Sequence, residues 1–255
     1  MCLIVFAYKS HPKYKFIFAA NRDEFYDRPT EQADYWKDNP ELLAGKDLQA
    51  GGTWMGITMG GRFAAVTNYR DLINIKEDAP SRGMLTLDFL NNDIPAGKYY
   101  ENLNPSLQDY NGFNIILGSI DELFYFSTHT SGIEKLEPGI YGLSNAILNT
   151  EWYKVKKSKG VLSTLLKHDK VHPWELLSLL NDTRKAKDDE LPDTGVGMEW
   201  EKVLSSIFIQ SPKYGTRCST AVVVDIENNV RFAEKTFFGN QGAFSNKDYS
   251  FKIKD

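Results

Sequence analysis

Hydrophobic positions dominate the start of the chain, where Leu3 to Tyr8 form an apolar and partly β-branched run. Such a run predicts a strand that is buried along most of its length. A second apolar run spans residues 14–20, and the segment His11-Pro12-Lys13 between the two has the composition of a turn. Residues 2–20 are therefore expected to form a β-hairpin.

The second run leads into four polar residues, Asn21-Arg22-Asp23-Glu24. Charged stretches are most often solvated, so the simplest interpretation is an exposed strand end. Rigid sheets also present their chemical groups at such ends. In an antiparallel hairpin the second strand ends near the start of the first, so Arg22 and Asp23 are expected to lie near Cys2.

The middle of the chain mixes strand and helix patterns. Residues 27–50 are mostly polar, which predicts a long loop of the kind that often carries function. Residues 81–110 have helical character, with a break at Pro95. The glycines before Trp54 are expected to permit a close backbone approach or a bulge. Strands are predicted at residues 54–58, 62–67, 112–120, 123–127 and 140–145.

The last third of the chain begins with helices and closes with strands. Residues 152–167 predict an amphipathic helix whose lysines, including Lys154, lie on the solvent side. The segment 184–196 is charged and carries glycine and proline, which favours a mobile loop. Further helices are predicted at residues 173–180 and 200–207, and a closing hairpin at residues 220–225 and 230–238. This order of elements predicts an α+β fold with antiparallel sheets.

Composition excludes several classes of protein. The chain has 255 residues, a net charge of −4 and no long basic block, so it is not expected to bind nucleic acid. It lacks an apolar stretch long enough to span a membrane and a secretory signal, so a soluble cytoplasmic protein is expected. Its two cysteines, Cys2 and Cys218, suit a reducing compartment and have no zinc spacing. His168 and His172 have the spacing of a zinc protease helix, but Pro173 disfavours helical geometry there. No metal is therefore expected.

Cys2 is the first candidate for chemistry. If Met1 is removed, Cys2 carries a thiol and a free α-amine, and the amine can take the thiol's proton and return it later. The alternative is that Cys2 only fills space, because unpaired cysteines are among the most buried residues. If Met1 is retained, the amine is tied up in a peptide bond and cannot act as a base.

Other polar residues near predicted strand ends complete a possible catalytic set. Asparagine side chains can stabilise the oxyanion of a tetrahedral intermediate, and an arginine can lower the pKa of a thiol. An aspartate can orient the amine or the arginine. The candidate catalytic residues are Cys2, Arg22, Asp23, Asn68, Asn145 and Arg217.

Several short motifs together resemble the NRDE family, also called the transport and Golgi organisation family. The matches run from residue 2 to about residue 225. They are Cys2 after Met1, Ala20-Asn21-Arg22-Asp23-Glu24, Gly51-Gly52-Thr53-Trp54-Met55-Gly56, Val66-Thr67-Asn68-Tyr69-Arg70, Asn111-Gly112-Phe113-Asn114, Leu143-Ser144-Asn145 and Gly215-Thr216-Arg217.

The resemblance implies a four-layer αββα sandwich in one domain over residues 1–255, similar to the N-terminal-nucleophile hydrolases. Among those hydrolases, the chain is similar to the cysteine branch, which includes penicillin V acylases and bile-salt hydrolases. There the first residue of the processed chain, here Cys2, is the nucleophile. Those enzymes place an aspartate three residues after the arginine. Here that position is Phe25, so Asp23 is the remaining aspartate candidate.

The expected function is hydrolysis of a linear, non-peptide carbon–nitrogen amide bond in a small-molecule substrate, without a cofactor. The resemblance also implies an alternative, a binding or trafficking protein for haem or for lipid and acyl ligands on the same scaffold. The sequence leaves the identity of the substrate and the oligomeric state open.

Overall fold

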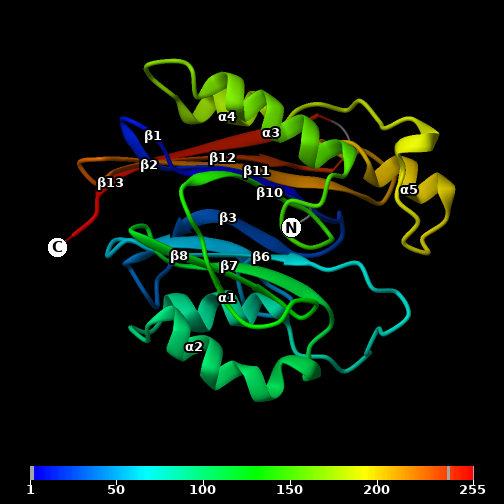
Figure 1. Cartoon of the computed structure of the whole chain (residues 1–255), viewed down its shortest axis with the longest axis horizontal. Coiled ribbons are helices and arrows are strands. Elements are labelled where there is room, and N and C mark those ends of the chain that lie inside the picture. Colours follow the sequence, from blue (N-terminus) through cyan, green and yellow to red (C-terminus); the bar gives the residue numbers. More distant parts are fainter. Residues whose placement is uncertain (1–2, 240–241, 255) are drawn as a thin grey trace.

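The computed structural model describes residues 3–239 and 242–254, which form four layers (Figure 1). Two antiparallel sheets stack face to face, and helices cover the outer face of each sheet. The six-stranded sheet has the order β10-β1-β2-β11-β12-β13, and the seven-stranded sheet runs from β3 to β9 in chain order. This is the predicted α+β, αββα sandwich.

The six-stranded sheet joins the two ends of the chain. Its centre is the hairpin of β1 and β2 with β11 alongside, in a register that pairs Leu3 with Asn21 and Asp23 with Thr216. The strands are β1 (Leu3–His11), β2 (Tyr14–Phe25), β10 (Gly139–Leu143), β11 (Tyr214–Asp225), β12 (Asn229–Phe237) and β13 (Phe244–Lys252).

The seven-stranded sheet is built from consecutive strands, because short turns suffice to connect antiparallel neighbours. Its strands are β3 (Thr30–Tyr35), β4 (Leu42–Asp47), β5 (Met55–Thr58), β6 (Arg62–Asn68), β7 (Phe113–Ser119), β8 (Glu122–Ser127) and β9 (Glu134–Lys135). Close packing fixes one turn of this sheet. A Cβ atom on Gly52 would lie 2.5 Å from the carbonyl carbon of Gly83, which confirms the predicted close approach.

The helices cover opposite outer faces. α3 (Tyr153–Leu165) and α4 (Pro173–Leu179) pack on the six-stranded sheet, and α1 (Arg82–Leu90) packs on the other sheet beside α2 (Ala96–Leu103). α5 (Met198–Leu204) lies at one end of the sandwich (Figure 1). Short 3₁₀ helices span Asn104–Asp109 and Asp188–Glu190.

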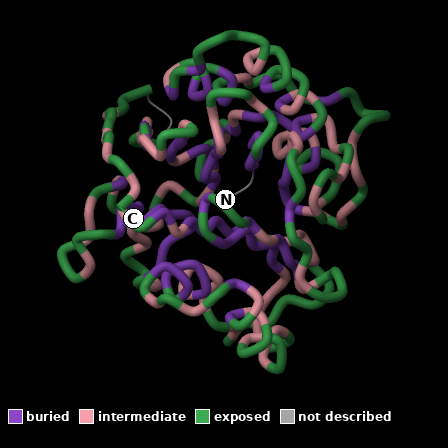
Figure 2. The backbone as a smooth tube through the Cα atoms, turned by 60° about the vertical axis from the view of Figure 1, so that its left-hand side comes forward, coloured by how far each residue is buried: buried purple, intermediate pink, exposed green. Residues whose placement is uncertain are grey.

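The period of two along each central strand divides the core. Ile4, Phe6 and Phe18 face the space between the sheets, whereas Leu3 and Ile17 pack against the helices. Figure 2 shows that buried segments concentrate in the middle of the molecule and exposed segments in its outer loops. Strands covered on both faces are apolar at almost every position, which explains why β1 has no polar alternation.

The structure confirms most predicted elements and corrects four predictions. Residues 27–50 are not a structureless loop, because they contain β3 and β4. The polar residues 21–24 are not a solvated strand end, because β2 continues to Phe25 and pairs with β11. The strand predicted at residues 220–225 begins earlier, at Tyr214, so Thr216 and Arg217 lie within β11 rather than ahead of it. Lys154 is only 2% exposed, beside Glu201 in a small space between α3 and α5, and does not face solvent.

The structure shows where His168 and His172 lie and how long and apolar the helices are. The His172 side chain accepts a hydrogen bond at the start of α4, so His168 and His172 do not share a helix. No group of side chains with the composition of a metal site occurs among residues 3–239 and 242–254. Within the same residues, no helix has the length and apolar character needed to cross a membrane.

Candidate active site

The polar segment of β2 is divided between the two faces of its sheet. Asn21 faces the helices, where its amide donates to the carbonyls of Leu180 (3.0 Å) and Ile207 (2.8 Å). Its Oδ1 accepts the hydroxyl of Ser219 at 2.6 Å. Asp23, two residues on, accepts the hydroxyl of Thr216 at 2.6 Å. Both side chains are buried, and both join β2 to its surroundings on the helix side.

Arg22 points the other way, into the space between the sheets. Its guanidinium carbon lies 4.4 Å from the centre of the Trp54 ring, and its side chain is 4% exposed. The Trp54 ring fills the space that a Cβ atom on Gly45 would occupy. Nη1 of Arg22 is buried and has no hydrogen-bond partner among the described residues. A buried donor of this kind is costly unless a ligand or a reacting group uses it.

Asp47 supplies the carboxylate that faces Arg22. Its Oδ1 accepts the amides of Gln49 (3.0 Å) and Ala50 (3.1 Å), which fixes the turn after β4. Its Oδ2 lies 2.7 Å from Nε of Arg28 and 3.5 Å from Nη2 of Arg22. Burial acts to raise the pKa of Asp47, but the hydrogen bonds from Arg28 and Ala50 outweigh it and lower the pKa below its usual value.

Asn68 and Asn145 meet where the two sheets join. The Asn145 amide donates to the carbonyl of Asn68 at 2.9 Å, and the Arg70 N–H donates to the carbonyl of Asn145 at 2.8 Å. Next to them, the Thr67 hydroxyl donates to the carbonyl of Ser144 at 2.8 Å. Asn145 is buried, whereas Asn68 is exposed at the end of β6. The Asn68 side chain is therefore free to meet a substrate.

Arg217 holds the backbone that connects the two sheets. It lies at a register shift between Thr216 and Cys218 in β11. Its Nη1 donates to the carbonyls of Phe25 (2.7 Å) and Arg28 (3.0 Å). Burial lowers the pKa of Arg217, and the nearby charge of Arg22 lowers it further. Through these hydrogen bonds, Arg217 fixes the backbone segment that carries Arg28.

Of the two cysteines, only Cys218 lies among the described residues. Cys2 lies outside the described residues, directly before β1, whose first residue Leu3 pairs with Asn21. Cys218 is buried opposite Arg22 in the strand register. Burial raises the pKa of the Cys218 thiol well above its usual value. A thiol held neutral in this way is a poor nucleophile.

A cleft beside these residues has two parts. The first part, about 370 Å³, we call the charged half; it is lined by Arg22, Glu24, Arg28, Asp47, Glu77 and Arg82, among others. The second part, about 300 Å³, we call the apolar half; its lining includes Tyr69, Leu72, Ile75, Val196, Leu204 and Tyr214. Asn68, Arg82 and Asn111 line both parts. Of the predicted residues, Arg22 and Asn68 line the charged half, and Asn68 and Asn145 the apolar half.

A larger cavity, about 690 Å³, lies elsewhere. It is lined by Lys13 near the β1–β2 turn, by Glu175 of α4 and by Asn229 near the β11–β12 turn. None of the predicted site residues lines it. Because β2 begins near this cavity and ends near Arg22, the two lie at opposite ends of the six-stranded sheet.

Sequence reasoning missed Asp47, Trp54, Glu24 and Arg28 as site residues. Asp47 falls in the segment 27–50, which was predicted to be a loop. Glu24 carried a usable signal, because it has the same parity as Arg22 along an extended strand and therefore shares its face. Asp23 has the opposite parity, and its Oδ1 accepts the Thr216 hydroxyl. Its expected place beside Cys2 stays a prediction, because Cys2 lies outside the described residues.

Comparisons with known proteins agree in family and in fold. A sequence profile described as Transport and Golgi organisation 2 matches residues 1–239. The chain is 34% identical over 261 residues to the "Transport and Golgi organization protein 2 homolog" of Bos taurus, covering 94% of each chain. It is 30% identical over 268 residues to "Transport and Golgi organization protein 2" of Drosophila melanogaster, covering 94% of this chain and 93% of the relative.

Solved structures share the fold at low sequence identity. The "N-acylethanolamine-hydrolyzing acid amidase (NAAA) ortholog" of Caenorhabditis elegans gives a TM-score of 0.51 at 11% identity, over 87% of this chain and 92% of the other. A mutant "conjugated bile acid hydrolase" from Clostridium perfringens gives 0.51 at 10% identity, over 100% of this chain and 97% of the other. At these identities the likeness establishes the architecture alone.

Proposed function

Because the chain belongs to the Transport and Golgi organisation 2 family and has the fold of N-terminal-nucleophile hydrolases, we propose that it is a cysteine amidohydrolase. Its substrate would be a small molecule with a linear carbon–nitrogen amide bond. The observation that carries the proposal is the environment of Arg22. A buried guanidinium with an unused donor among the described residues lines the cleft, close to where β1 begins.

The proposed reaction begins at Cys2 once Met1 has been removed. The α-amine takes the thiol proton, and the thiolate attacks the carbonyl carbon of the amide. The carbon–nitrogen bond then breaks, and the leaving amine takes the proton from the α-ammonium group. Water attacks the resulting thioester, giving up a proton to the α-amine. The acid leaves and the thiol is restored, so the only net reactant besides the amide is water.

The other residues stabilise charge or hold these groups in place. In this proposal Arg22 stabilises the thiolate, which needs a nearby positive charge at neutral pH. The Asn68 amide donates to the oxyanion, and Asn145 positions Asn68 through its carbonyl. Asp47 orients Arg22, a role that the sequence suggested for Asp23.

A second function is favoured by one observation, the names of the relatives. They are described by transport and Golgi organisation, not by a reaction. A binding or trafficking protein for haem, lipid or acyl ligands on the same scaffold would fit those names. In that case Cys2 would be a ligand or a packing residue. Haem titration followed by absorbance distinguishes this alternative, because a saturable change lost in Cys2→Ala supports it.

The chain offers a matched control for the hydrolase proposal, because it has one other cysteine. We would measure hydrolysis of a panel of fluorogenic acyl amides of aminomethylcoumarin by wild type, Cys2→Ala and Cys218→Ala. We expect Cys2→Ala to lose all turnover and Cys218→Ala to keep it, since the Cys218 thiol is held neutral by burial. Turnover that survives in Cys2→Ala would remove the proposal.

Two further expectations stay proposals. We propose that residues 1–255 act as one domain, supported by the three apolar clusters that run through both sheets and their helices. We also propose a cytoplasmic location, supported by the composition and by Cys218, which forms no disulfide among the residues that the structure describes. Fluorescence microscopy of the tagged chain in its own host tests the location.

A further inference from the structure

We propose that the site accepts an amphiphilic amide, with its apolar group in the apolar half of the cleft and its polar head in the charged half. This inference rests on the proposed hydrolase function and adds the substrate class to it. It assigns a substrate-binding role to Leu72 and Ile75, which no residue pattern in the sequence singled out.

Two charged side chains that line the apolar half, Arg70 and Asp71, are paired with neighbouring residues. Arg70 lines it, but its Nη1 lies 2.8 Å from the Glu201 carboxylate. Asp71 also lines it, but its carboxylate accepts the Asn74 side chain at 2.7 Å and lies 3.4 Å from Nε2 of His129. Apart from Asn68, Arg82, Asn111 and Asn145, the remaining side chains that line this half are aliphatic or aromatic. Such a surface favours a hydrocarbon group.

The charged half has the opposite character. Arg22, Arg28 and Arg82 line it together with Glu24, Asp47 and Glu77. Both signs of charge are therefore present, and Nη1 of Arg22 is a buried donor without a partner in the described chain. Burying a hydrocarbon group against these side chains would strip them of water without replacing the hydrogen bonds. A polar head group that accepts and donates hydrogen bonds fits this half.

The change in polarity occurs at the proposed reactive position. Asn68 lines both halves, as do Arg82 and Asn111. An amide whose carbonyl lies at Asn68 would therefore extend one group into each half. Cleavage there would separate an apolar product from a polar one.

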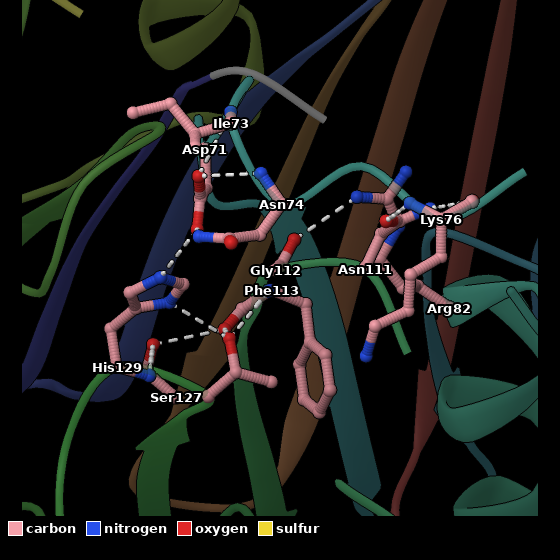
Figure 3. Close-up of polar contacts among 11 residues, drawn as sticks. Asp71, Ile73, Asn74, Lys76, Arg82, Asn111, Gly112, Phe113, Ser127 and His129 are labelled. Atoms are coloured by element: carbon pink, nitrogen blue, oxygen red, sulfur yellow. Dashed lines mark hydrogen bonds and ion pairs between the residues drawn. The ribbon is translucent and has the colours of Figure 1, made fainter. Parts of the chain in front are cut away.

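Leu72 and Ile75 lie in the loop of residues 71–76, and hydrogen bonds anchor this loop (Figure 3). Asp71 accepts the amides of Ile73 and Asn74, both at 3.2 Å. Asn111 accepts the Lys76 N–H at 2.8 Å and donates to the Lys76 carbonyl at 2.9 Å. Hydrogen bonds at both ends of the loop hold Leu72 and Ile75 at the cleft, which Val196 and Leu204 also line.

Exposure supports the same assignment. Leu72 is 42% exposed and Ile75 59% exposed, although both line the cleft. Exposed apolar side chains that are grouped together can mark a ligand-binding groove. Ile73 lies between them, is 94% exposed and lines neither half, so it serves as a matched control.

The test measures binding in the Cys2→Ala chain, which removes turnover. The ligands are N-acylglycines with acetyl, octanoyl and dodecanoyl groups, and the readout is Kd from titration calorimetry. We expect Kd to fall about threefold to fourfold per added methylene until the apolar half is full. Ile75→Asp and Leu72→Asp should each weaken dodecanoyl binding about tenfold or more and leave acetyl binding unchanged. Ile73→Asp should match the parent.

Three results would overturn the inference. They are equal affinity for acetyl and dodecanoyl ligands, equal damage from Ile73→Asp and Ile75→Asp, and no binding of any ligand in the series. Because the assay needs no turnover, its failure is distinct from the failure of the hydrolase proposal. Circular dichroism of each variant confirms that the exposed substitutions leave the fold intact.

Discussion

Asn21 and Arg22, which lie on opposite faces of β2, differ in how fully their side chains are satisfied. On the helix face, Asn21 makes three hydrogen bonds and Asp23 accepts the Thr216 hydroxyl. On the cleft face, Arg22 keeps one buried donor without a partner in the described part of the chain. The odd positions of this short motif bond to the surrounding structure, whereas in the proposed function its even positions take part in the chemistry.

The difference has an energetic meaning. A satisfied buried amide stabilises its surroundings, because removing it leaves its partners unpaired at about 1–3 kcal/mol for each group. A buried donor without a partner lowers the free energy of unfolding until a ligand accepts its hydrogen bond. Active sites commonly carry such a cost, and changing those residues often lowers activity without lowering stability. The variants below test this contrast, from the largest expected effect to the smallest.

Arg22→Gln is expected to have the largest effect on the reaction. We expect kcat/KM to fall about 10²- to 10³-fold, the usual loss when one charge-stabilising donor is removed. The melting temperature should stay equal or rise, because Gln keeps polar contacts and removes a buried charge. Amide hydrolysis and thermal melting of the same preparations measure both. A large fall in melting temperature would place Arg22 with the structural residues.

Asn21→Ala should show the opposite profile. It leaves the carbonyls of Leu180 and Ile207 and the Ser219 hydroxyl without a partner in the core. We expect about 3 kcal/mol of lost stability and a lower melting temperature by about 6–12 °C. The folded fraction should keep kcat near wild type. Normal stability together with lost turnover would contradict the division of the two faces.

Asp47→Asn tests the electrostatics of the cleft face through pH. Because the folded-state pKa of Asp47 is lowered, the charged carboxylate stabilises the fold at every pH above its unfolded pKa of about 3.9. That stabilisation is lost as pH falls through the lower folded pKa. We expect wild type to exceed Asp47→Asn by about 1–2 kcal/mol at neutral pH, and the gap to close only in strong acid. A gap that closes near neutral pH would exclude this cause.

Asp23→Asn and Glu24→Gln form the smallest and most closely matched comparison. Each removes one charge from neighbouring positions that face opposite ways. Asp23→Asn should cost about 1 kcal/mol of stability, because the amide oxygen can still accept the Thr216 hydroxyl. Glu24→Gln should change stability by less than about 0.5 kcal/mol and alter KM, since Glu24 lines the cleft. Identical profiles for the two variants would show that the faces are equivalent.

Much of the fold was predictable because the central strands are continuous apolar runs. The β1–β2 hairpin and the β11–β12 hairpin follow from such runs, and the resemblance supplied the layers. The edge strands β3 and β13 were missed for a physical reason, whereas the edge strand β10 was predicted at residues 140–145. β3 reads Thr30–Tyr35 with one buried residue, and β13 alternates between exposed and half-buried positions. Edge strands need few apolar residues, so their sequences resemble loops.

The candidate site was predictable only in part. Arg22, Asn68 and Asn145 were found because each follows or ends an apolar run. Asp47 was hidden because it ends β4, a strand within the segment predicted to be a loop, and because its contact with Arg22 comes from the other sheet. Lys154 was misplaced because a helix pattern treats lysine as solvated, whereas a neighbouring element covers it here.

The measurement that tests the central claim most directly is the intact mass of the active protein from its own host, followed by the mass after brief exposure to an acyl amide substrate. We predict a chain that lacks Met1, with a transient acyl adduct that maps to Cys2 and is absent from Cys2→Ala. Active protein that retains Met1 would contradict the account, because the proposed base would then be part of a peptide bond.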